Sequence, residues 1–387
     1  MSETLAYGCH SIDDADVAAV VEALRSDRIT QGERVERFEA ALAQYCGARH
    51  AIAVSSGSAA LHLACLALGL ERAAGGPPRV ATTPLSFLAT ANAIGHCGGR
   101  AVFADVDADT WNLCPLDLAR VAETGSAPLR GVVAVDFAGH PCDIEAISAV
   151  AKESGAFVVR DACHALGASW LDRAGQSHRV GDGAFSDATC LSFHPVKHIT
   201  TGEGGALLTQ SDRVAERCRE LRENGMVRNT DPESPWVYEM HAPGFNYRIS
   251  DIQCALGLSQ LGRLERGLAR RREIAHMYDE AFASVSEVAI PRSGAGVEHA
   301  WHLYVLRVPD RQRVFNELRA RGIGVQVHYV PIHLQPYYRK RSPELELPEA
   351  ERYYARALSI PMHPGLRDTD VARVVEEVKR AVAGAPR

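Results

Sequence analysis

The 387-residue sequence lacks closely paired cysteines, long hydrophobic runs and an excess of positive charge. It has ten cysteines but no Cys-x-x-Cys pair, so neither a zinc ribbon nor a redox dithiol is expected. A chain of this length also needs no disulfides to hold its fold. We therefore expect free, buried thiols in a reducing compartment, at Cys9, Cys46, Cys65, Cys97, Cys114, Cys142, Cys163, Cys190, Cys218 and Cys254.

The charge balance argues against two classes of partner. Charged residues make up 23% of the chain, the net charge is -6 and the pI is near 6.2, which is atypical of proteins that bind nucleic acid or membrane surfaces. No apolar stretch approaches the length of a bilayer span. Met1 to Ala6 has neither the basic segment nor the apolar run of a signal peptide, so the cytoplasm is the expected location.

The sequence contains enough apolar residues for a large core, because 46% of them are hydrophobic. The length favours two domains over one. We expect an N-terminal segment and large domain over residues 1–250, and a smaller C-terminal domain over residues 251–387. No internal repeat or low-complexity segment interrupts this division.

Two helices are expected near the N-terminus. Asp13 to Arg25 has helical periodicity, and Ser11 and Asp14 stand in the spacing of a capping box. Its apolar face would carry Val17, Val20, Val21 and Leu24. A second helix is expected to end at Gly47, after a polar turn at Asp27 to Gly32.

Short apolar runs then alternate with helical stretches such as Ser58 to Leu68 and Ile144 to Glu153. This alternation predicts an α/β fold, with a mostly parallel sheet and helices on both faces. The expected strands are 51–54, 80–83, 101–106, 132–135, 157–160 and 206–209.

The pattern changes after residue 250. A long helix is expected over Asp251 to Arg272, and the later segments read as a smaller α/β domain. That domain would contain strands at 301–308 and 325–328 and helices at 311–321 and 368–382. Within the expected large domain, Met226 to Met240 is rich in turn-forming residues and is expected to be a mobile loop.

The first candidate functional segment is Val54 to Leu61, where a strand ends and a helix opens through small residues. Such a turn lets backbone N–H groups approach an anion, and the helix dipole favours negative charge there. Gly57, Ser58 and Ala59 are therefore candidates to hold a phosphate. An ordinary strand-to-helix turn with Ser58 as the cap explains the same residues.

The second candidate is Asp161, where the apolar strand Phe157 to Arg160 stops, with His164 three residues later. Ligands of open α/β sheets bind at the carboxyl ends of strands. A carboxylate there could pair with a protonated ring nitrogen and keep it cationic. Asp161 could equally be a helix cap and His164 a buried histidine with internal partners.

The third candidate is Lys197, which lies in a stretch rich in glycine and threonine between Leu191 and Gly205. A lysine removed from water has a lowered pKa and becomes an amine able to form a Schiff base. The alternative is a surface-loop lysine, although few of those have such small and apolar neighbours. Together, a phosphate turn, a carboxylate for a pyridine nitrogen and a Schiff-base lysine are the parts that pyridoxal phosphate (PLP) requires.

At these motifs the chain resembles the sugar aminotransferases named for DegT, DnrJ, EryC and StrS, a family of the PLP-dependent transferase fold type I (aspartate aminotransferase-like). The resemblance runs from about Tyr7 to the C-terminal helix and is most specific at Asp161 to Ala168, Ser192 to Gly205 and Asn246 to Leu261. Segments Leu5 to Gly8, Ile29 to Gly32 and Gly324 to Ile332 resemble the pseudaminic acid branch. Members of that branch aminate C4 of UDP-4-keto-6-deoxy-N-acetyl-altrosamine with L-glutamate.

The resemblance implies a role for each matching residue. Lys197 would carry the cofactor as a Schiff base and move protons, Asp161 would hold the ring nitrogen and His164 the ring hydroxyl. Phe87 would stack on the ring, and the phosphate would contact Gly57, Ser58, Ser192 and, from the other subunit of a homodimer, Asn246. The nucleotide sugar would be lined by Tyr7, Asp27, Arg28, Ile29, Thr30, His328 and Tyr329. The cofactor would alternate between PLP and its amine form, PMP, as it takes the amino group from the donor.

Other functions remain open at this point. An aminotransferase acting at C3 or C4 of another TDP-, GDP- or UDP-keto sugar fits the same motifs. The sugar dehydratase branch has histidine in place of the Schiff-base lysine, so Lys197 argues against it. A non-catalytic PLP-binding regulatory protein is less favoured, because no DNA-binding module is evident. No metal site is expected. Pro195 interrupts the i,i+4 spacing of His194 and His198, Pro331 separates His328 from His333, and no Cys, His and carboxylate cluster has the spacing of a zinc site.

Overall fold

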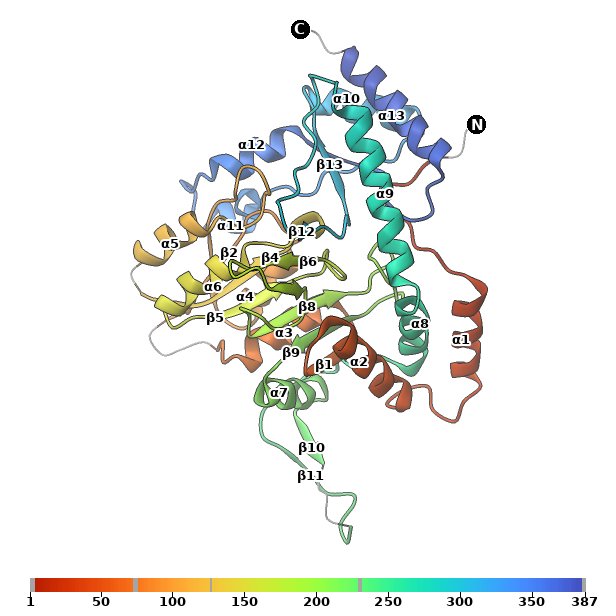
Figure 1. Ribbon diagram of the computed structural model, residues 1–387. Coiled ribbons are helices and arrows are strands. Elements are labelled where there is room, and N and C mark those ends of the chain that lie inside the picture. Colours follow the sequence, from red (N-terminus) through yellow and green to blue (C-terminus); the bar gives the residue numbers. More distant parts are fainter. Residues whose placement is uncertain (1–3, 72–75, 126, 229–231, 385–387) are drawn as a thin grey trace.

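The computed structural model describes residues 4–71, 76–125, 127–228 and 232–384. Its centre is a seven-stranded sheet with helices on both faces (Figure 1). Only β9 runs against the other strands, so the expectation of a mostly parallel sheet is confirmed. In spatial order the strands are β1 (His50–Val54), β9 (Gly205–Thr209), β8 (Ala188–Ser192), β5 (Phe157–Asp161), β4 (Leu129–Val135), β2 (Arg79–Thr82) and β3 (Arg100–Phe103).

Alternating side chains of the strands pack into two separate hydrophobic cores. In β4, Val132 and Ala134 point into one core, and Val133 points into the other. One face of the sheet packs against α2 (Glu33–Cys46), α5 (Pro115–Glu123), α6 (Ile144–Glu153) and α8 (Asp251–Leu261). The opposite face packs against α3 (Gly57–Ala67), α4 (Ala89–His96) and α7 (Asp212–Arg222). Burial on both faces explains why the strands read as continuous apolar runs.

The C-terminal residues build a further layer around a two-stranded antiparallel sheet of β13 (Tyr304–Arg307) and β14 (Ala357–Ile360). Its core is shared with α9 (Leu264–Phe282), α10 (Arg311–Ala320) and α13 (Asp368–Ala383). The shorter elements are α1 (Asp14–Leu24), η1 (Phe137–Gly139), η2 (Ile332–Leu334), α11 (Pro336–Arg339), α12 (Pro348–Arg356), and a small sheet of β12 (Val297–Glu298), β6 (Ser169–Leu171) and β7 (Ser177–Arg179).

Two expectations for the C-terminal part were wrong. Residues 325–328 form no strand, because only Gln326 makes an isolated bridge, to Ser359. The true partner of β13 is β14, which directly follows a helix and pairs with residues about fifty positions away. The expected helix 251–272 is two helices, since it breaks at Gly262 and Arg263 between α8 and α9.

The first helix also differs from expectation. Its capping box is made by Asp13 and Asp16, whose side chains each accept from the other's backbone N–H at 3.1 Å, and not by Ser11 and Asp14. The apolar face is largely uncovered, with Val17 52% and Leu24 56% exposed. The end of α2 at Gly47 is confirmed, with this glycine at φ +78°.

Residues 226–240 were expected to be a mobile loop, and the described part is a hairpin. Its strands β10 (Met226–Arg228) and β11 (Tyr238–Met240) pair antiparallel and extend from the body of the molecule (Figure 1). Residues 229–231 of the expected loop lie outside the described residues. The hairpin exposes Val227, Trp236, Val237, Tyr238 and Met240.

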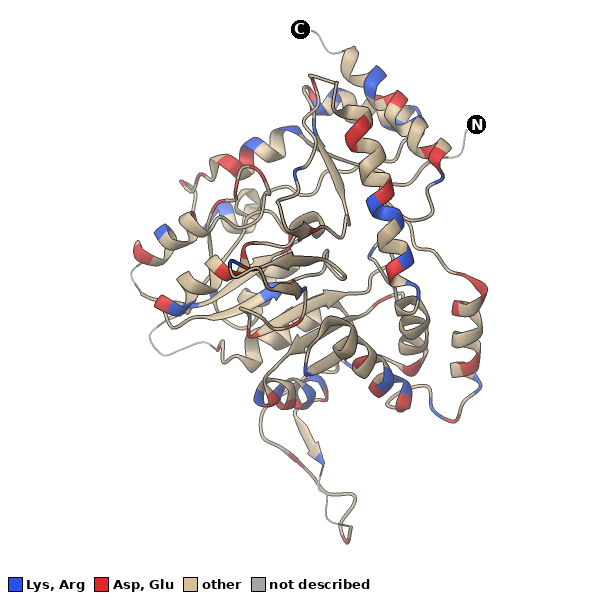
Figure 2. Cartoon of the chain, in the orientation of Figure 1, with Lys and Arg blue, Asp and Glu red and all other residues tan. Residues whose placement is uncertain are grey.

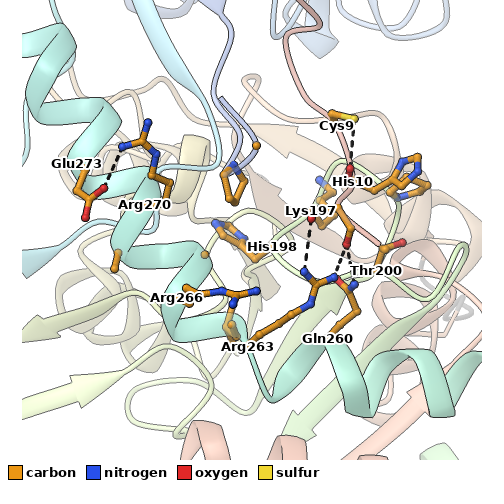
Figure 3. Close-up of a pocket in the computed structure, with 17 residues that line it drawn as sticks. Cys9, His10, Lys197, His198, Thr200, Gln260, Arg263, Arg266, Arg270 and Glu273 are labelled. Atoms are coloured by element: carbon orange, nitrogen blue, oxygen red, sulfur yellow. Dashed lines mark hydrogen bonds and ion pairs between the residues drawn. The ribbon is translucent and has the colours of Figure 1, made fainter. Parts of the chain in front are cut away.

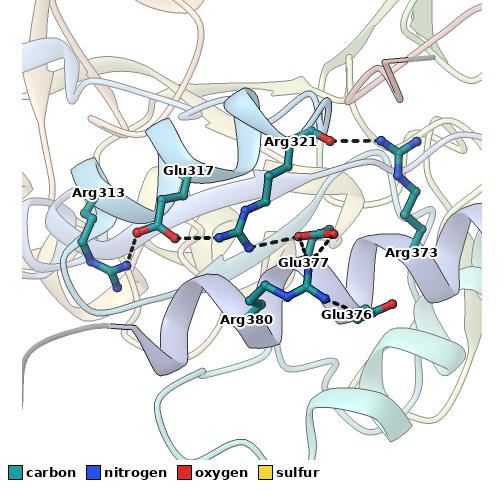
Figure 4. Close-up of polar contacts among 7 residues, drawn as sticks. All are labelled: Arg313, Glu317, Arg321, Arg373, Glu376, Glu377 and Arg380. Atoms are coloured by element: carbon teal, nitrogen blue, oxygen red, sulfur yellow. Dashed lines mark hydrogen bonds and ion pairs between the residues drawn. The ribbon is translucent and has the colours of Figure 1, made fainter. Parts of the chain in front are cut away.

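Charged residues lie mainly on the outer helices, where both signs occur (Figure 2). One network links α10 to α13: Arg321 contacts Glu317 at 3.5 Å and Glu377 at 3.0 Å, and Arg380 contacts Glu377 at 3.0 Å (Figure 4). Each such pair is partly exposed and contributes little alone, so apolar packing holds these helices together. None of the helices described is long and apolar enough to cross a membrane. Seven of the ten cysteines are buried as free thiols, and Cys9 is exposed.

The β6–β7 turn is held by a histidine between two carboxylates. His178 Nδ1 is 2.8 Å from Asp182, and Nε2 is 3.2 Å from Asp172. Burial lowers the pKa of His178, but the hydrogen bonds to both carboxylates outweigh it and raise the pKa above 6.5. The protonated ring therefore stabilises the fold fully below the unfolded pKa, and this contribution is lost as pH rises through the folded pKa.

We expect His178→Gln to lower the unfolding temperature most at about pH 6, with a difference from the wild type that narrows towards about pH 9. Thermal unfolding followed by circular dichroism measures this difference. His276→Gln, an exposed histidine of α9, is the matched control and should show a small difference throughout. A His178→Gln defect that stays constant with pH would mean that the ring's charge contributes nothing.

Candidate active site

A pocket of about 460 Å³ opens at the carboxyl ends of the parallel strands. Val135 ends β4, Asp161 ends β5 and Ser192 ends β8, and all three line it. Parallel strands that run side by side bring their ends to the same edge of a sheet. The pocket therefore lies at one edge of the central sheet.

The N-terminus of α3 forms one wall of the pocket. Ser56, and not Ser58, is the cap, because its Oγ accepts from the N–H of Ala59 at 3.1 Å. Gly57 and Ser58 line the pocket and leave free N–H groups at the positive end of the helix dipole. A Cβ on Gly57 would lie 2.9 Å from Ser192 Cβ, so only glycine lets the helix approach β8 this closely.

We expect Gly57→Ala to weaken cofactor binding by about tenfold or more, because the new methyl group pushes the first turn of α3 away from β8. A titration of the apoprotein with PLP, followed by absorbance, measures the affinity. Gly95→Ala is the control, since a Cβ there meets nothing within 4 Å. Unchanged affinity in Gly57→Ala would exclude this turn as the phosphate site.

Asp161 is 5% exposed and is held by two donors. Thr90 Oγ1 donates to its Oδ2 at 2.7 Å, and the N–H of Cys163 donates to its Oδ1 at 3.2 Å. Ser86 Oγ lies 2.5 Å from Thr90 Oγ1 and extends this chain of hydrogen bonds. The carboxylate therefore has a fixed orientation towards the pocket, which is what a partner for a cationic ring nitrogen needs.

Lys197 lies in the loop between β8 and β9. The loop is closed by hydrogen bonds from the N–H of Phe193 to Gly204 O at 2.8 Å and from the N–H of Thr201 to Phe193 O at 3.0 Å. Phe193 is fully buried and packs edge-on against Phe38, with the ring centroids 5.3 Å apart. Burial lowers the pKa of Lys197, although Cys163 and Asp161 partly oppose this. A lysine with a lowered pKa has more of the neutral amine that attacks carbonyl groups.

His164 lies beside Asp161 and is also buried. Its Nε2 is 3.3 Å from the hydroxyl of Tyr329, and its Nδ1 has no partner among the described residues. The ring of His302 lies 4.3 Å from it, centroid to centroid. Burial, and secondly the charge of Lys197, lower the pKa of His164 well below 6.5. The ring is therefore neutral, with one nitrogen available to a ligand.

Aromatic side chains form the mouth of the pocket. Phe87 is 60% exposed and lies 6.2 Å from Tyr329, centroid to centroid. Tyr7 packs against His328 at 5.2 Å. His328 is fixed by Ser359 Oγ, 2.8 Å from its Nδ1, and burial lowers its pKa to about 3. The mouth thus combines the N-terminal segment with loops from the C-terminal layer.

Comparison with known proteins gives a match over nearly the whole chain. Residues 10–379 match the model of the DegT/DnrJ/EryC1/StrS aminotransferase family. The chain belongs to this family. Spore coat polysaccharide biosynthesis protein SpsC of Bacillus subtilis is 38% identical, with 98% of each chain covered. The UDP-4-amino-4,6-dideoxy-N-acetyl-beta-L-altrosamine transaminase of Campylobacter jejuni is 35% identical, with 98% of this chain and all of the other covered.

Solved structures confirm the expected fold of the DegT/DnrJ/EryC1/StrS member. Helicobacter pylori PseC, an aminotransferase involved in the biosynthesis of pseudoaminic acid, superposes with a TM-score of 0.91 at 31% identity, covering 99% and 100% of the two chains. The sugar aminotransferase Spr1654 of Streptococcus pneumoniae, in its PLP form, gives 0.88 at 26% identity, covering 98% and 99%. This family member is an aminotransferase that uses PLP.

The residues of this family member fit that cofactor. The free N–H groups of α3 suit a phosphate, and the close approach at Gly57 shapes a cradle for it. The orphaned Nδ1 of His164 can bond a polar group of the ring. Asp161 and Lys197 meet in the same pocket, so a carboxylate and an amine are present for the ring nitrogen and the aldehyde.

Most of the expected site residues come together in this pocket: Tyr7, Gly57, Ser58, Phe87, Asp161, His164, Ser192, Lys197, His328 and Tyr329. Ala59 does not line it, and its N–H is engaged by Ser56. Asp27 to Thr30 line a different pocket, of about 650 Å³, together with Arg222, Arg228 and Arg248. Asn246 is exposed and bridges to Glu223 of that second pocket.

Sequence reasoning missed three residues that support the site. Ser56 is the true cap of α3, Thr90 anchors Asp161, and His302 packs on His164. Thr90 lies three residues after Phe87, so helical spacing from a candidate aromatic residue was the only available signal. His302 reaches the site from the C-terminal layer, and no pattern in the neighbouring sequence predicts its role. Across the described ranges, no cluster of three or more His, Cys, Asp or Glu side chains is placed to hold a metal ion.

Proposed function

We propose that the chain transfers an amino group from L-glutamate to a keto sugar carried by a nucleotide, at C4 of UDP-4-keto-6-deoxy-N-acetyl-altrosamine. The observation that carries the proposal is the meeting of Lys197, Asp161 and the α3 N-terminus in one pocket whose mouth is lined by aromatic side chains. The similarity to the altrosamine transaminase of Campylobacter jejuni and to PseC supports the choice of sugar.

The cofactor, when bound, withdraws electrons from the substrate carbon that loses its proton. Asp161 keeps the ring nitrogen cationic, because its carboxylate is anchored by Thr90 and Cys163 and cannot turn away. Gly57, Ser58 and Ser192 bind the phosphate. Phe87 covers the ring and orients it. His164 bonds the ring hydroxyl through the nitrogen that has no protein partner.

Lys197 moves the protons. As a neutral amine, its Nζ would remove the proton from the donor carbon. In its protonated form it would give that proton back, and the same side chain would serve in the opposite direction for the acceptor sugar. The lowered pKa of Lys197 suits both steps, because the amine must be neutral as a base and charged as an acid near neutral pH.

A second candidate acceptor is another nucleotide-linked keto sugar, aminated at C3 or C4. The spore coat polysaccharide protein SpsC is 38% identical, slightly more than the altrosamine transaminase at 35%. The chemistry proposed for Lys197 is the same for both acceptors. The sugar dehydratase branch is disfavoured by Lys197 in the pocket.

The test incubates the PLP form with L-glutamate and a panel of UDP-, TDP- and GDP-linked 4-keto and 3-keto sugars. Mass spectrometry then identifies which sugar gains the amine. We expect the UDP-4-keto-altrosamine derivative to be the best acceptor. If the cofactor converts with glutamate but no sugar is aminated, the proposed substrate class is wrong.

We also propose that the active enzyme is a homodimer with shared sites. Asp27 to Thr30 and Asn246 lie at a pocket separate from Lys197 in this chain, although the family resemblance assigns them to substrate and phosphate. A second copy that presents this surface to the first would join the two halves of the site. Asn246 would then reach the partner's cofactor phosphate, and Asp27 to Thr30 its sugar nucleotide.

Mixing two inactive variants tests this arrangement. Lys197→Ala and Asn246→Asp should each be inactive, and a 1:1 mixture refolded together should recover about 25% of wild-type activity, because half the dimers then contain one intact site of two. A chain that carries both substitutions, mixed with either single variant, is the control and should recover none. No recovery in the first mixture would place Lys197 and Asn246 in the same subunit's site.

A further inference from the structure

A third pocket, which we call the α9 pocket, adjoins the loop that carries Lys197. It has a volume of about 420 Å³. Its walls are α9, the N-terminal segment Cys9 to Ser11, the loop from Pro195 to Thr200, and Pro364 with Gly365. Tyr7 lines the active-site pocket and Cys9 the α9 pocket, so the N-terminal segment passes from one to the other. The two pockets thus share the lysine loop.

The lining of the α9 pocket is strongly positive. Arg263 precedes the first residue of α9, Arg266 and Arg270 project from its first two turns, and His198 lies across from them (Figure 3). Glu273 is the single carboxylate of the lining. The chain as a whole has a net charge of -6, so this concentration of cations is a local feature. A concave site lined by one sign of charge attracts ions of the other sign.

Two of the three arginines are already engaged. Arg263 pairs with Asp16, and Arg270 with Asp368 at 2.6 Å. Arg266 makes no hydrogen bond or ion pair with any of the residues that the structure describes, although it faces the pocket. Its guanidinium therefore keeps all its donors for a ligand. A planar fork of donors is the side chain best matched to a carboxylate or a phosphate.

A buried charge beside the pocket adds to the positive potential. Arg271, which directly follows Arg270 in α9, is 1% exposed and donates to the carbonyl oxygens of Trp301 at 3.0 Å and Met362 at 2.8 Å. No carboxylate of the described chain pairs with it. Burial lowers its pKa to about 10, so it stays charged at neutral pH. Its charge is thus offset only by backbone dipoles.

We propose that the α9 pocket binds a small oxyanion, a carboxylate or a phosphate, with Arg266 as its principal ligand. The α9 pocket shares Lys197 with the active-site pocket, and its other lining residues are different. The proposal does not depend on the sugar that the enzyme aminates. The bound anion lies against the loop that holds Lys197. Occupancy therefore places a negative charge next to the segment that presents the catalytic amine.

The experiment uses the PLP-loaded protein and isothermal titration calorimetry. Inorganic phosphate and glutarate are titrated separately, glutarate being a dicarboxylate without an amino or keto group to transfer. Arg266→Gln should weaken binding of the favoured anion by about tenfold or more, because it removes a charge-assisted pair of hydrogen bonds. Arg266→Lys should give an intermediate loss, since it keeps the charge but not the fork.

Arg213→Gln is the matched control, because Arg213 is exposed on α7 and has no hydrogen bond or ion pair within the described ranges. It removes the same charge and should leave both affinities unchanged. The anion whose affinity falls in Arg266→Gln identifies the ligand class. Any binding heat that remains in that variant is assigned to the active site. Equal affinities in the wild type and Arg266→Gln, or an equal loss in Arg213→Gln, would overturn the proposal.

Discussion

Lys197→Ala is expected to lower transamination by about 10⁴-fold or more, because the variant loses both the group that carries the cofactor and the base that moves the proton. The pocket supports this expectation, since Lys197 is the lysine that lines it. The variant should still fold, because the loop is held by backbone hydrogen bonds at Phe193 and Thr201 that do not involve the lysine side chain. Steady-state assays with glutamate and circular dichroism measure activity and folding.

A matched substitution separates this effect from general loss of charge. Lys152 is exposed on α6, and Lys152→Ala should retain full activity. Lys197→Arg keeps the charge but cannot form the covalent link, so it should be as inactive as the alanine variant. Substantial turnover in either Lys197 variant would contradict the assigned role.

Asp161→Asn is expected to lower the rate of proton removal by about 100-fold or more, because a neutral amide would no longer stabilise a cationic ring. The amide has nearly the same shape as the carboxylate and can keep one of the two hydrogen bonds from Thr90 and Cys163. Single-turnover conversion of the cofactor by glutamate, followed by absorbance, reports this step directly.

Thr90→Val distinguishes charge from orientation. It removes the 2.7 Å hydrogen bond to Asp161 but leaves the carboxylate in place, so we expect a loss of only about tenfold. Cofactor affinity should change little in either variant, because the proposed phosphate site at α3 is left unchanged. If Asp161→Asn converts the cofactor at the wild-type rate, the carboxylate is not the partner of the ring nitrogen.

The central sheet could be predicted from the sequence because burial on both faces gives each parallel strand a continuous apolar run. β1, β4, β5 and β9 all begin and end within three residues of the expected bounds. β8 was not predicted, although it lies next to the lysine loop, since its residues Ala188–Ser192 include polar threonine and serine. β14 was missed because its main partner is the distant β13, and local periodicity carries no information about such a partner.

The site residues could be predicted where the signal for their role lies in neighbouring residues of the sequence. Asp161 ends a strand, and Lys197 stands among glycines and threonines, so both signals are local. The residues that orient them come from elsewhere: Thr90 from α4 and His302 from the C-terminal layer. Their contacts form only when the chain folds. The sequence also gave no sign that Asp27 to Thr30 line a different pocket from the one that contains Lys197.

The central claim is a covalent link between PLP and Lys197, and borohydride reduction followed by peptide mapping tests it most directly. The chain has only four lysines, and Lys152, Lys340 and Lys379 are all exposed, so the result is unambiguous. We predict that the PLP-loaded protein, reduced and digested, yields a single pyridoxyl-modified peptide containing Lys197. A stoichiometric label on any other lysine, or no label in protein that is saturated with cofactor and active, would contradict it.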